Sequence, residues 1–374
     1  MIVKDNIYGT IEFDELEERI INTPEFQRLR RIKQMSITNL VYPGANHTRF
    51  EHSLGTAHLA EKIAEKLVDN IEERKMIKLY ALLHDIGHVA FSHEGEDVLK
   101  RYLGDHEKIA KDIILKTQIA DIINENFNVK KILEIEEKGI GAIVDGDIGA
   151  DRMDYLKRDA LNTGVAYGII DIDRLVHTTR LVKNEMCITE GGLEAAEWLL
   201  VARFMMFSAV YLHKTVRIAT VMVHKAIEHA IKDNTIKPEE FIWMGDEFAL
   251  AKMRESPGAR EYVDRIIKRR LYKEVAVIRE KDITKKEAEK LENELKEKFG
   301  IDIIFDYPTQ FFKPIKLKVL KKNNALVPIS NLSDLVSSLN EAEEKRKKIM
   351  IITSEENKKK YGKKIQKELE NFLS

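Results

Sequence analysis

Histidine and aspartate residues at four positions form the pattern in this sequence that is best suited to chemistry. His84 and Asp85 stand side by side at the end of a predicted buried helix, Lys75–His84. An adjacent imidazole and carboxylate at a helix end, with an apolar body behind them, make a good pair of ligands for a borderline metal ion. His52 and Asp151 are each expected at the start of another helix. The four side chains can therefore converge on one metal ion.

Two imidazole nitrogens and two carboxylate oxygens favour particular metals. Such a set suits Fe, Mn, Zn, Ni or Co, and it suits Mg less well. A metal held in this way lowers the pKa of water toward neutrality and polarises a phosphoryl oxygen. The chemistry that these residues favour is therefore the hydrolysis of phosphate esters.

A lone buried His-Asp pair is more often a pair of satisfied core residues than a metal site. Here, however, histidine also recurs at positions 47, 88, 93 and 106, and Arg49 and Glu107 add charge to the same region. A core does not absorb so many polar groups unless they have partners. The surroundings therefore favour a functional site over a structural role.

Helical periodicity dominates the first 272 residues. Apolar residues recur there every three to four positions, which predicts amphipathic helices. Thr23 suits an N-cap and Pro24 suits the first helical position, so a helix is expected to begin there. Residues 180–190 indicate a short β-hairpin. We predict one mainly α unit over residues 1–272. Its expected helices are Ile11–Ile21, Pro24–Met35, Ser53–Ile71, Lys75–His84, Glu94–Leu103, Glu107–Glu125, Val129–Glu136, Asp151–Asn162 and Leu193–Asp233.

The residue pattern changes in the last part of the chain. A charged helix over Lys285–Phe299, closed by Gly300, lies among short runs of apolar β-branched residues. This alternation predicts a smaller C-terminal α/β module of β-α-β character over residues 273–374, for which the sequence indicates no task. The expected strands are Val275–Ile278, Ile301–Phe305, Ile315–Leu320 and Ile349–Thr353, and the expected terminal helix is Tyr361–Leu373.

The composition argues against several classes of protein. The chain has 62 Lys and Arg against 63 Asp and Glu, and the net charge of −1 argues against dedicated nucleic-acid binding. The single cysteine, Cys187, excludes an intrachain disulfide and a thiolate metal cluster. The longest apolar stretch, Phe204–Leu212, is shorter than the ~18–20 residues that span a bilayer, and the first residues lack the pattern of a signal peptide. We therefore expect a soluble cytoplasmic protein with no membrane partner.

Several segments resemble, in the same order, the motifs of one known family. Arg203 is followed eight residues later by Tyr211, which resembles a substrate-binding helix of that family. The family is the dNTP triphosphohydrolase branch of the HD superfamily. The resemblance implies an HD-domain helical bundle that hydrolyses nucleotides with a metal ion. The other segments that carry it are Thr23–Gln34, Tyr42–Gly55, Leu83–His93 and Asp151–Asp159.

Matching positions carry the family's roles onto this sequence. Three departures are visible: Arg152 replaces a lysine, Glu96 replaces an aspartate and Met35 replaces a leucine. The implied metal ligands are His52, His84, Asp85 and Asp151. The implied catalytic and supporting residues are His88, His93, Glu96, His106 and Glu107. The implied substrate-binding residues are Gln34, Arg49, Arg152, Tyr155, Asp159, Arg203 and Tyr211.

The implied reaction is hydrolysis at the α-phosphate of a deoxynucleoside triphosphate, which releases the deoxynucleoside and intact triphosphate. Arginine suits the phosphates because a planar guanidinium binds two oxygens at once. We expect His93, oriented by Glu96, to protonate the leaving 5′ oxygen, with His106 and Glu107 as the second candidate pair. We expect Tyr211 to crowd the 2′ position and exclude ribose, and Mg²⁺ to accompany the substrate phosphates as an additional ion.

Two other functions stay open at this point. One is an HD phosphatase or phosphodiesterase that acts on a monophosphate, a cyclic nucleotide or a guanosine alarmone. The other is a nucleotide-sensing or nucleic-acid-binding module whose catalysis is weak or lost. The set of arginines favours a polyphosphate over a monophosphate, and the complete ligand set argues against lost catalysis. Outside these roles, we interpret Arg158 as a surface charge.

Members of the family commonly form nucleotide-stabilised tetramers whose activator sites include the N-terminal segment. Gln27 and Arg30 match that pattern, whereas Asn22 replaces an aspartate that reads guanine. An amide presents one acceptor where guanine needs two, and an unsatisfied buried donor costs about 1–3 kcal/mol. We therefore expect a homo-oligomer, with a tetramer favoured, whose activity does not depend on GTP.

Overall fold

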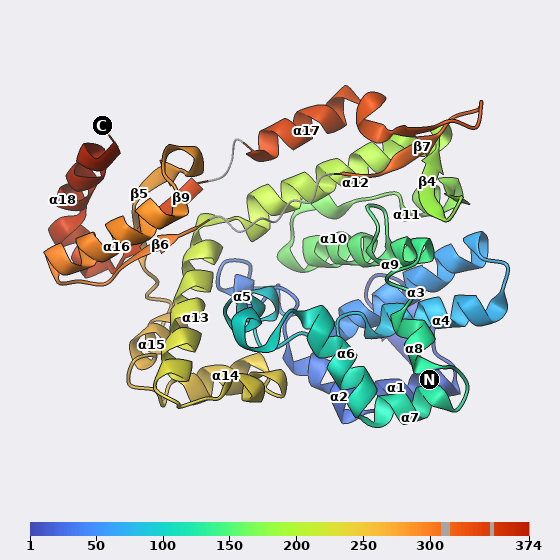
Figure 1. The fold of residues 1–374 in the computed structure, drawn as a ribbon, viewed down its shortest axis with the longest axis horizontal. Helices are drawn as coiled ribbons and strands as arrows, with labels where there is room; N and C mark the ends of the chain where they lie inside the picture. Colours follow the sequence, from blue (N-terminus) through green and yellow to red (C-terminus); the bar gives the residue numbers. More distant parts are fainter. Residues whose placement is uncertain (308–314, 345–347, 374) are drawn as a thin grey trace.

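The structure is a computed structural model that describes residues 1–307, 315–344 and 348–373. The predicted mainly α fold is confirmed, because helices form most of this part of the chain (Figure 1). The described α-helices are α1 (Glu15–Ile21), α2 (Pro24–Gln27), α3 (Arg49–Leu67), α4 (Ile71–Leu83), α5 (Ser92–Leu103), α6 (His106–Lys116), α7 (Gln118–Asn124), α8 (Val129–Leu133), α9 (Ala142–Asp145), α10 (Ala150–Thr163), α11 (Ile172–Thr178), α12 (Leu193–Met206), α13 (Lys214–Lys232), α14 (Asp246–Met253), α15 (Arg260–Ile267), α16 (Lys285–Phe299), α17 (Asp334–Glu344) and α18 (Glu355–Leu373). The described strands are β1 (Ile2–Asp5), β2 (Gly9–Glu12), β3 (Thr179–Val182), β4 (Glu185–Thr189), β5 (Lys273–Arg279), β6 (Ile303–Asp306), β7 (Lys318–Leu320), β8 (Leu326–Pro328) and β9 (Lys348–Thr353).

The N-terminal segment differs from the two helices expected there. An antiparallel hairpin of β1 and β2 comes first, and α1 begins only after Asp14, whose side chain caps it. The prediction of a helix from Ile11 onward was wrong because the hairpin strands are too short to show a clear period. Thr23 caps α2 as expected. The helix predicted up to Met35 is also too long, since α2 passes at Arg28–Arg31 into a 3₁₀ turn.

Three helices bring the predicted ligands together. α3 and α4 follow one another and pack closely, and α10 packs against α3 (Figure 1). Gly55 is a point of close approach, because a Cβ atom there would lie 2.0 Å from Asp154 Oδ1 and 2.4 Å from Arg158 Nη2. The absence of a side chain on α3 thus lets the charged face of α10 reach it.

The helical region predicted over residues 193–233 forms two helices, and the hairpin predicted in residues 180–190 is present as β3 and β4. A π-helical turn at Phe207–Tyr211 lies between α12 and α13. The helix predicted over residues 107–125 is instead broken at Thr117, which caps α7. No single helix of the described residues is long and apolar enough to cross a membrane; only Glu190–Tyr211 and Lys214–Lys232 pass that test together, and they are bent by 65°.

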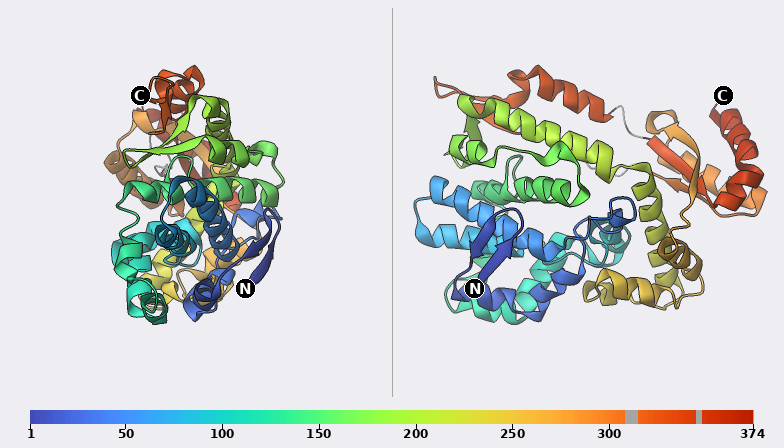
Figure 2. Two further views of the ribbon diagram at one scale, coloured as in Figure 1. Left: turned by 90° about the vertical axis from the view of Figure 1, so that its right-hand side faces the viewer. Right: turned by 180° about the vertical axis from the view of Figure 1, so that it is seen from behind.

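The C-terminal part contains an α/β unit with a hydrophobic cluster of its own. Its sheet has the order β5-β9-β6, and β9 is antiparallel to both neighbours. Leu291 and Leu295 of α16 pack in that cluster with Ile365 and Leu369 of α18. Gly300 ends α16 with a φ of +61°, as predicted. Figure 2 shows this unit at one end of the molecule, beside α13, with the N-terminus toward the other end.

Between β6 and β9 the chain leaves this unit and returns to the helical part. β7 pairs in parallel with β4 and antiparallel with β8, which completes a four-stranded sheet of order β3-β4-β7-β8. α17 then packs on α12 (Figure 1). The sequence patterns did not predict β8 or α17. β7, β8 and α17 belong to residues 273–374 but pack on the part formed by residues 1–272. The division into residues 1–272 and 273–374 stays a proposal.

We expect Gly55→Ala to destabilise the fold by about 1–3 kcal/mol, the usual range for overpacking. The added methyl group would meet Asp154 and Arg158, which are buried and charged. Thermal unfolding followed by circular dichroism measures the change. Glu65→Ala, on the exposed side of the same helix, is the control and should stay within about 0.5 kcal/mol. An unchanged midpoint for Gly55→Ala would show that α10 can move aside.

Candidate active site

The structure brings the four predicted metal ligands together. His52 lies in the first turn of α3, Asp151 in the first turn of α10, and His84 and Asp85 directly follow α4. His52 Nε2 lies 3.0 Å from Asp151 Oδ1 and 3.5 Å from Asp85 Oδ2. His84 Nε2 lies 3.4 Å from Asp85 Oδ1 and 3.7 Å from Asp151 Oδ1. The four groups surround one point that a single metal ion would fill.

Both histidines turn Nε2 toward this point. His52 Nδ1 lies 2.7 Å from Asp154 Oδ2, and His84 Nδ1 lies 2.7 Å from the carbonyl oxygen of Ala81. Partners on Nδ1 are how metal-binding histidines are usually oriented. Both Nε2 atoms are buried, and neither makes a hydrogen bond of good geometry with any described residue. These residues therefore fit a transition metal ion.

The carboxylates around His52 demand a positive charge there. Burial lowers the pKa of His52, but Asp151 and Asp154 outweigh it and raise that pKa to about 10. Burial likewise raises the pKa of Asp151, but His52 and His84 bring it well below its usual range. A metal ion and a proton therefore compete for the same imidazole, as expected of a metal-binding histidine.

A buried chain of charges supports His52 from behind. Arg158 Nε and Nη2 each lie 2.9 Å from an oxygen of Asp154, and Arg158 Nη1 lies 2.9 Å from Asp5 Oδ2 on β1. Burial raises the pKa of Asp154, but Arg158 and His52 lower it to about 2. The side chain of Arg158 is 0% exposed, so its interpretation as a surface charge was wrong. No local pattern predicts its distant partner Asp5.

Arg49 is fixed against a metal ligand. Its Nη1 donates to Asp85 Oδ2 at 2.6 Å, and its Nε donates to Ser92 Oγ at 3.0 Å. Burial raises the pKa of Asp85, but Arg49, His84 and His88 bring it well below its usual range. Arg49 thus holds Asp85 ionised while it also lines the cavity described below.

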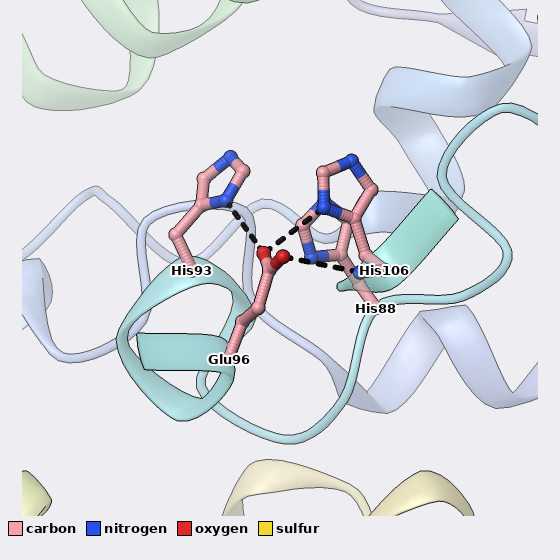
Figure 3. A group of neighbouring side chains, drawn as sticks. All are labelled: His88, His93, Glu96 and His106. Carbon is pink, nitrogen blue, oxygen red and sulfur yellow. Dashed lines mark hydrogen bonds and ion pairs between the residues drawn. The ribbon is translucent and has the colours of Figure 1, made fainter. Parts of the chain in front are cut away.

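A second cluster holds three histidines around one carboxylate, which bonds two of them (Figure 3). Glu96 Oε2 lies 3.2 Å from His93 Nδ1 and 2.9 Å from His106 Nδ1, and Glu96 Oε1 accepts from the backbone N–H of His106 at 3.1 Å. His88 stacks on His106 with 4.3 Å between ring centroids, and its Nε2 lies 3.2 Å from Asp85 Oδ1. The cluster therefore adjoins the metal-ligand group.

The two histidines bonded to Glu96 differ in proton affinity. Loss of hydration in the cavity lowers the pKa of His93 despite its bond to Glu96, although its side chain is not buried. Burial also lowers the pKa of His106, but its bonds to Glu96 outweigh that and raise the pKa. The two histidines in turn hold the pKa of Glu96 well below its usual range against the effect of burial. Among the described residues it is Glu96, and not the exposed Glu107, that meets the imidazole of His106.

Backbone strain places His93. Phe91 and Ser92 have φ values of +67° and +54° directly before it. A bulky residue rarely adopts this left-handed conformation, and it persists only where the surroundings fix it. Here the side chain of Asp246 accepts the N–H of Phe91 at 2.8 Å. Such strain is typical of functional sites.

A cavity of about 1380 Å³ opens in front of both clusters. All predicted substrate-binding residues line it, and so do His84, Asp85, Asp151, His93, His106 and Glu107. Its far wall includes α16 and β6 residues, among them Lys285, Asn293 and Phe305. No residue pattern predicts that the C-terminal module reaches this cavity. His52, His88 and Glu96 lie behind the wall.

One end of the cavity is built around Asp159. Its Oδ1 lies 2.7 Å from His47 Nε2, and its Oδ2 accepts from the hydroxyl of Tyr211 at 2.6 Å. Burial and the charge of Asp159 raise the pKa of Tyr211, which keeps the phenol protonated. Tyr211 ends the π-helical turn, a distortion frequent at functional sites. His47 was noted in the sequence but not assigned to this group.

Comparison with known proteins bears on the family of this chain. Family models of the HD domain and of the HD associated region match residues 49–159 and 170–371. An uncharacterized protein of Methanocaldococcus jannaschii is 36% identical over 91% of this chain and 76% of that protein. A deoxynucleoside triphosphate triphosphohydrolase SAMHD1 homolog of Dictyostelium discoideum is 27% identical over 73% of this chain and 59% of that protein. The crystal structure of a hypothetical protein from Aquifex aeolicus has a TM-score of 0.82 and 32% identity, with 99% of both chains covered.

We expect His84→Ala and Asp85→Ala to lose bound metal and hydrolytic activity together, because each removes a ligand of the same group. Elemental analysis of the purified protein measures the metal, and treatment of the wild type with a chelator should reproduce the loss of activity. His177→Ala, an exposed histidine on α11, is the matched control and should keep its metal. A ligand variant that retains both metal and full activity would remove these residues from the metal site.

Proposed function

The chain belongs to the HD-domain phosphohydrolases, and from that premise we propose that it hydrolyses deoxynucleoside triphosphates to deoxynucleoside and intact triphosphate. The observation that carries the proposal is the content of one cavity. Three members of the metal-ligand group, three arginines and the pair of Asp159 and Tyr211 line it. Phosphate-binding and sugar-reading groups in one cavity with a metal site are what a nucleotide polyphosphate requires.

The metal site supplies the reactive step. A divalent transition metal such as Fe, Mn, Zn, Ni or Co, held by His52, His84, Asp85 and Asp151, would act as a Lewis acid toward a phosphoryl oxygen and lower the pKa of water. The protein's own task is then to bind, orient and protonate. Arg49, Arg152 and Arg203 neutralise the triphosphate oxygens, with Mg²⁺ as an additional ion on the phosphates.

We propose that His93 donates the proton to the leaving 5′ oxygen. Its side chain is 60% exposed, against 23% for His106, so it has the freer access to a substrate in the cavity. A bound triphosphate brings negative charge that raises the pKa of His93 toward the protonated form. Glu96 orients the ring through Nδ1, which leaves Nε2 to face the substrate. His88 and Glu107 are assigned supporting roles.

We assign recognition of the sugar to the Asp159 end of the cavity. Asp159 and Gln34 bond the 3′-OH, and the side-chain oxygen of Gln34 is buried without a partner among the described residues. The hydroxyl of Tyr211 is held on Asp159, and its ring occupies the space that a 2′-OH would need. Tyr155 lines the same cavity as a further substrate contact.

We also propose that the protein is a homo-oligomer, with a tetramer favoured, whose activity does not require GTP. Gln27 and Arg30 lie together, since Arg30 Nε donates to Gln27 Oε1 at 2.8 Å, and the Arg30 guanidinium lies 3.5 Å from the centre of the Phe50 ring. Asn22 is exposed directly after α1. The amide of Gln27 and the exposed guanidinium of Arg30, which lies on the ring of Phe50, support an accessory nucleotide site. Asn22 lowers the preference of that site for guanine.

We expect a panel of nucleotides to show hydrolysis of dNTPs with release of triphosphate, and a lower kcat/KM for ATP than for dATP. The purified, metal-loaded chain is assayed with dNTPs, NTPs, monophosphates, cyclic nucleotides and a guanosine alarmone, and products are identified by anion-exchange chromatography. Each assay is run with and without GTP, which should change the rate little. Release of orthophosphate from a monophosphate alone would instead identify an HD phosphatase. Strict dependence on GTP would contradict the role given to Asn22.

We expect His93→Ala to lower kcat by about 10²–10⁴-fold, the usual contribution of general acid catalysis. Metal content and KM should change little, because His93 lies outside the metal-ligand group. Steady-state kinetics and elemental analysis of the same preparation measure both. Glu96→Gln should lower kcat in the same direction, and His177→Ala should not. An unchanged kcat in His93→Ala would transfer the role to His106.

A further inference from the structure

Arg152 takes its position from a carboxylate that lies outside the motif segments, Asp147. Asp147 stands in the turn between α9 and α10. Its Oδ1 lies 2.6 Å from Arg152 Nη1, and each side chain is only 15% exposed. A charge-assisted hydrogen bond that is largely shielded from water is strong and directional. Arg152 is adjacent to the metal-site residue Asp151 and lines the cavity.

The second oxygen of Asp147 binds a segment far along the chain. Oδ2 accepts the backbone N–H groups of Lys316 at 2.6 Å and Leu317 at 2.9 Å. These residues directly precede β7, and Leu317 is 4% exposed and accepts the N–H of Ile329 at 2.9 Å. The turn before α10 and the start of β7 are thus joined by one side chain.

This arrangement keeps Arg152 both fixed and cationic. The two N–H groups also bind the carboxylate of Asp147, so its negative charge does not fully offset the positive charge of the Arg152 guanidinium. Only Nη1 of Arg152 bonds to Asp147, and a guanidinium has further N–H groups with which to bind phosphate oxygens. An arginine that sampled many rotamers would have to be ordered by the substrate, at a cost in affinity.

We propose that Asp147 is a positioning residue, which holds Arg152 ready for the substrate phosphates and does so only while residues 316–317 are docked on it. The proposal rests on the proposed function, in that it assigns Arg152 to a phosphate-bearing substrate. Under this proposal, the segment of β7, β8 and α17 that packs on the helical part has a role in substrate binding.

The first test is a double-mutant cycle on the full-length, metal-loaded protein. Asp147→Ala should raise KM for the preferred dNTP by about tenfold to hundredfold, the value of a charge-assisted hydrogen bond, while kcat changes little. Arg152→Ala should raise KM similarly. The double variant should bind no more weakly than Arg152→Ala alone, because Asp147 acts through Arg152. Additive effects, or an unchanged KM in Asp147→Ala, would overturn the proposal.

Matched variants separate positioning from general stability. Glu185→Ala removes the 2.7 Å ion pair between Glu185 on β4 and Lys318 on β7. This variant should leave KM unchanged. Asp147→Asn keeps the shape and loses the charge, so it should fold even if Asp147→Ala does not, and its KM should lie between the wild type and Arg152→Ala. Thermal unfolding and metal content are measured for each variant. A rise in KM for Glu185→Ala equal to that for Asp147→Asn would overturn the positioning role.

The backbone contact is tested at Lys316, whose side chain is exposed. Lys316→Pro removes one of the two N–H donors, whereas Lys316→Ala keeps it. KM should rise in the proline variant and not in the alanine variant. Equal KM in both would overturn the dependence on the docked segment.

Binding of inorganic tripolyphosphate, followed by isothermal titration calorimetry, distinguishes failure of this proposal from failure of the proposed function. If no dNTP is hydrolysed, the proposed function fails, but Asp147→Ala should still weaken tripolyphosphate binding by about tenfold or more. An unchanged Kd for tripolyphosphate in Asp147→Ala would overturn the positioning role even if dNTPs are hydrolysed.

Discussion

The carboxylates around the buried imidazole of His52 favour a positive charge there, carried by a proton or by a metal ion, and a continuous chain of opposite charges supports them. Asp154 faces the imidazole, Arg158 faces Asp154, and Asp5 faces Arg158. Removing one member would leave its neighbour as an uncompensated buried charge, which costs several kcal/mol. The chain joins the N-terminal hairpin, α10 and α3, and Gly55 provides the room in which they meet. The position of the metal-ligand group is therefore set by residues that do not line the cavity.

The loop after Asp85 is held just as firmly. The buried guanidinium of Arg28 donates to the carbonyl oxygens of Ile86 and His88, and burial lowers the pKa of Arg28 to about 10. Gly87 packs so closely on α6 that a Cβ atom would lie 1.9 Å from the carbonyl oxygen of His106. Because this loop carries His88 and contacts His106, the metal-ligand group and the Glu96 cluster form one rigid block. Such rigidity is what keeps reactive groups at productive distances.

The parts of this structure that could be predicted are those with local signals. Helical periodicity, the Thr23 cap and Gly300 predicted elements that are present, and the motif segments predicted the residues that meet around the cavity. The errors have equally physical causes. Arg158 looks like a surface charge because its main partner outside α10, Asp5, is distant in sequence, and the hairpin of β1 and β2 is too short to show a period. The pairing of β7 with β4 and the contacts of Asp147 depend on tertiary packing, for which a single sequence carries no local pattern.

The pairing of Cys187 with Lys318 also sets an order of events during synthesis. The chain leaves the ribosome from its N-terminal end, so β4 emerges long before its neighbour β7. Until then the free edge of β4 presents unpaired backbone groups, which are a template for association with other chains. Such a pairing between distant residues also forms slowly. The four-stranded sheet therefore cannot be completed on a nascent chain until β7 has emerged, and until then the β4 edge is exposed to other chains.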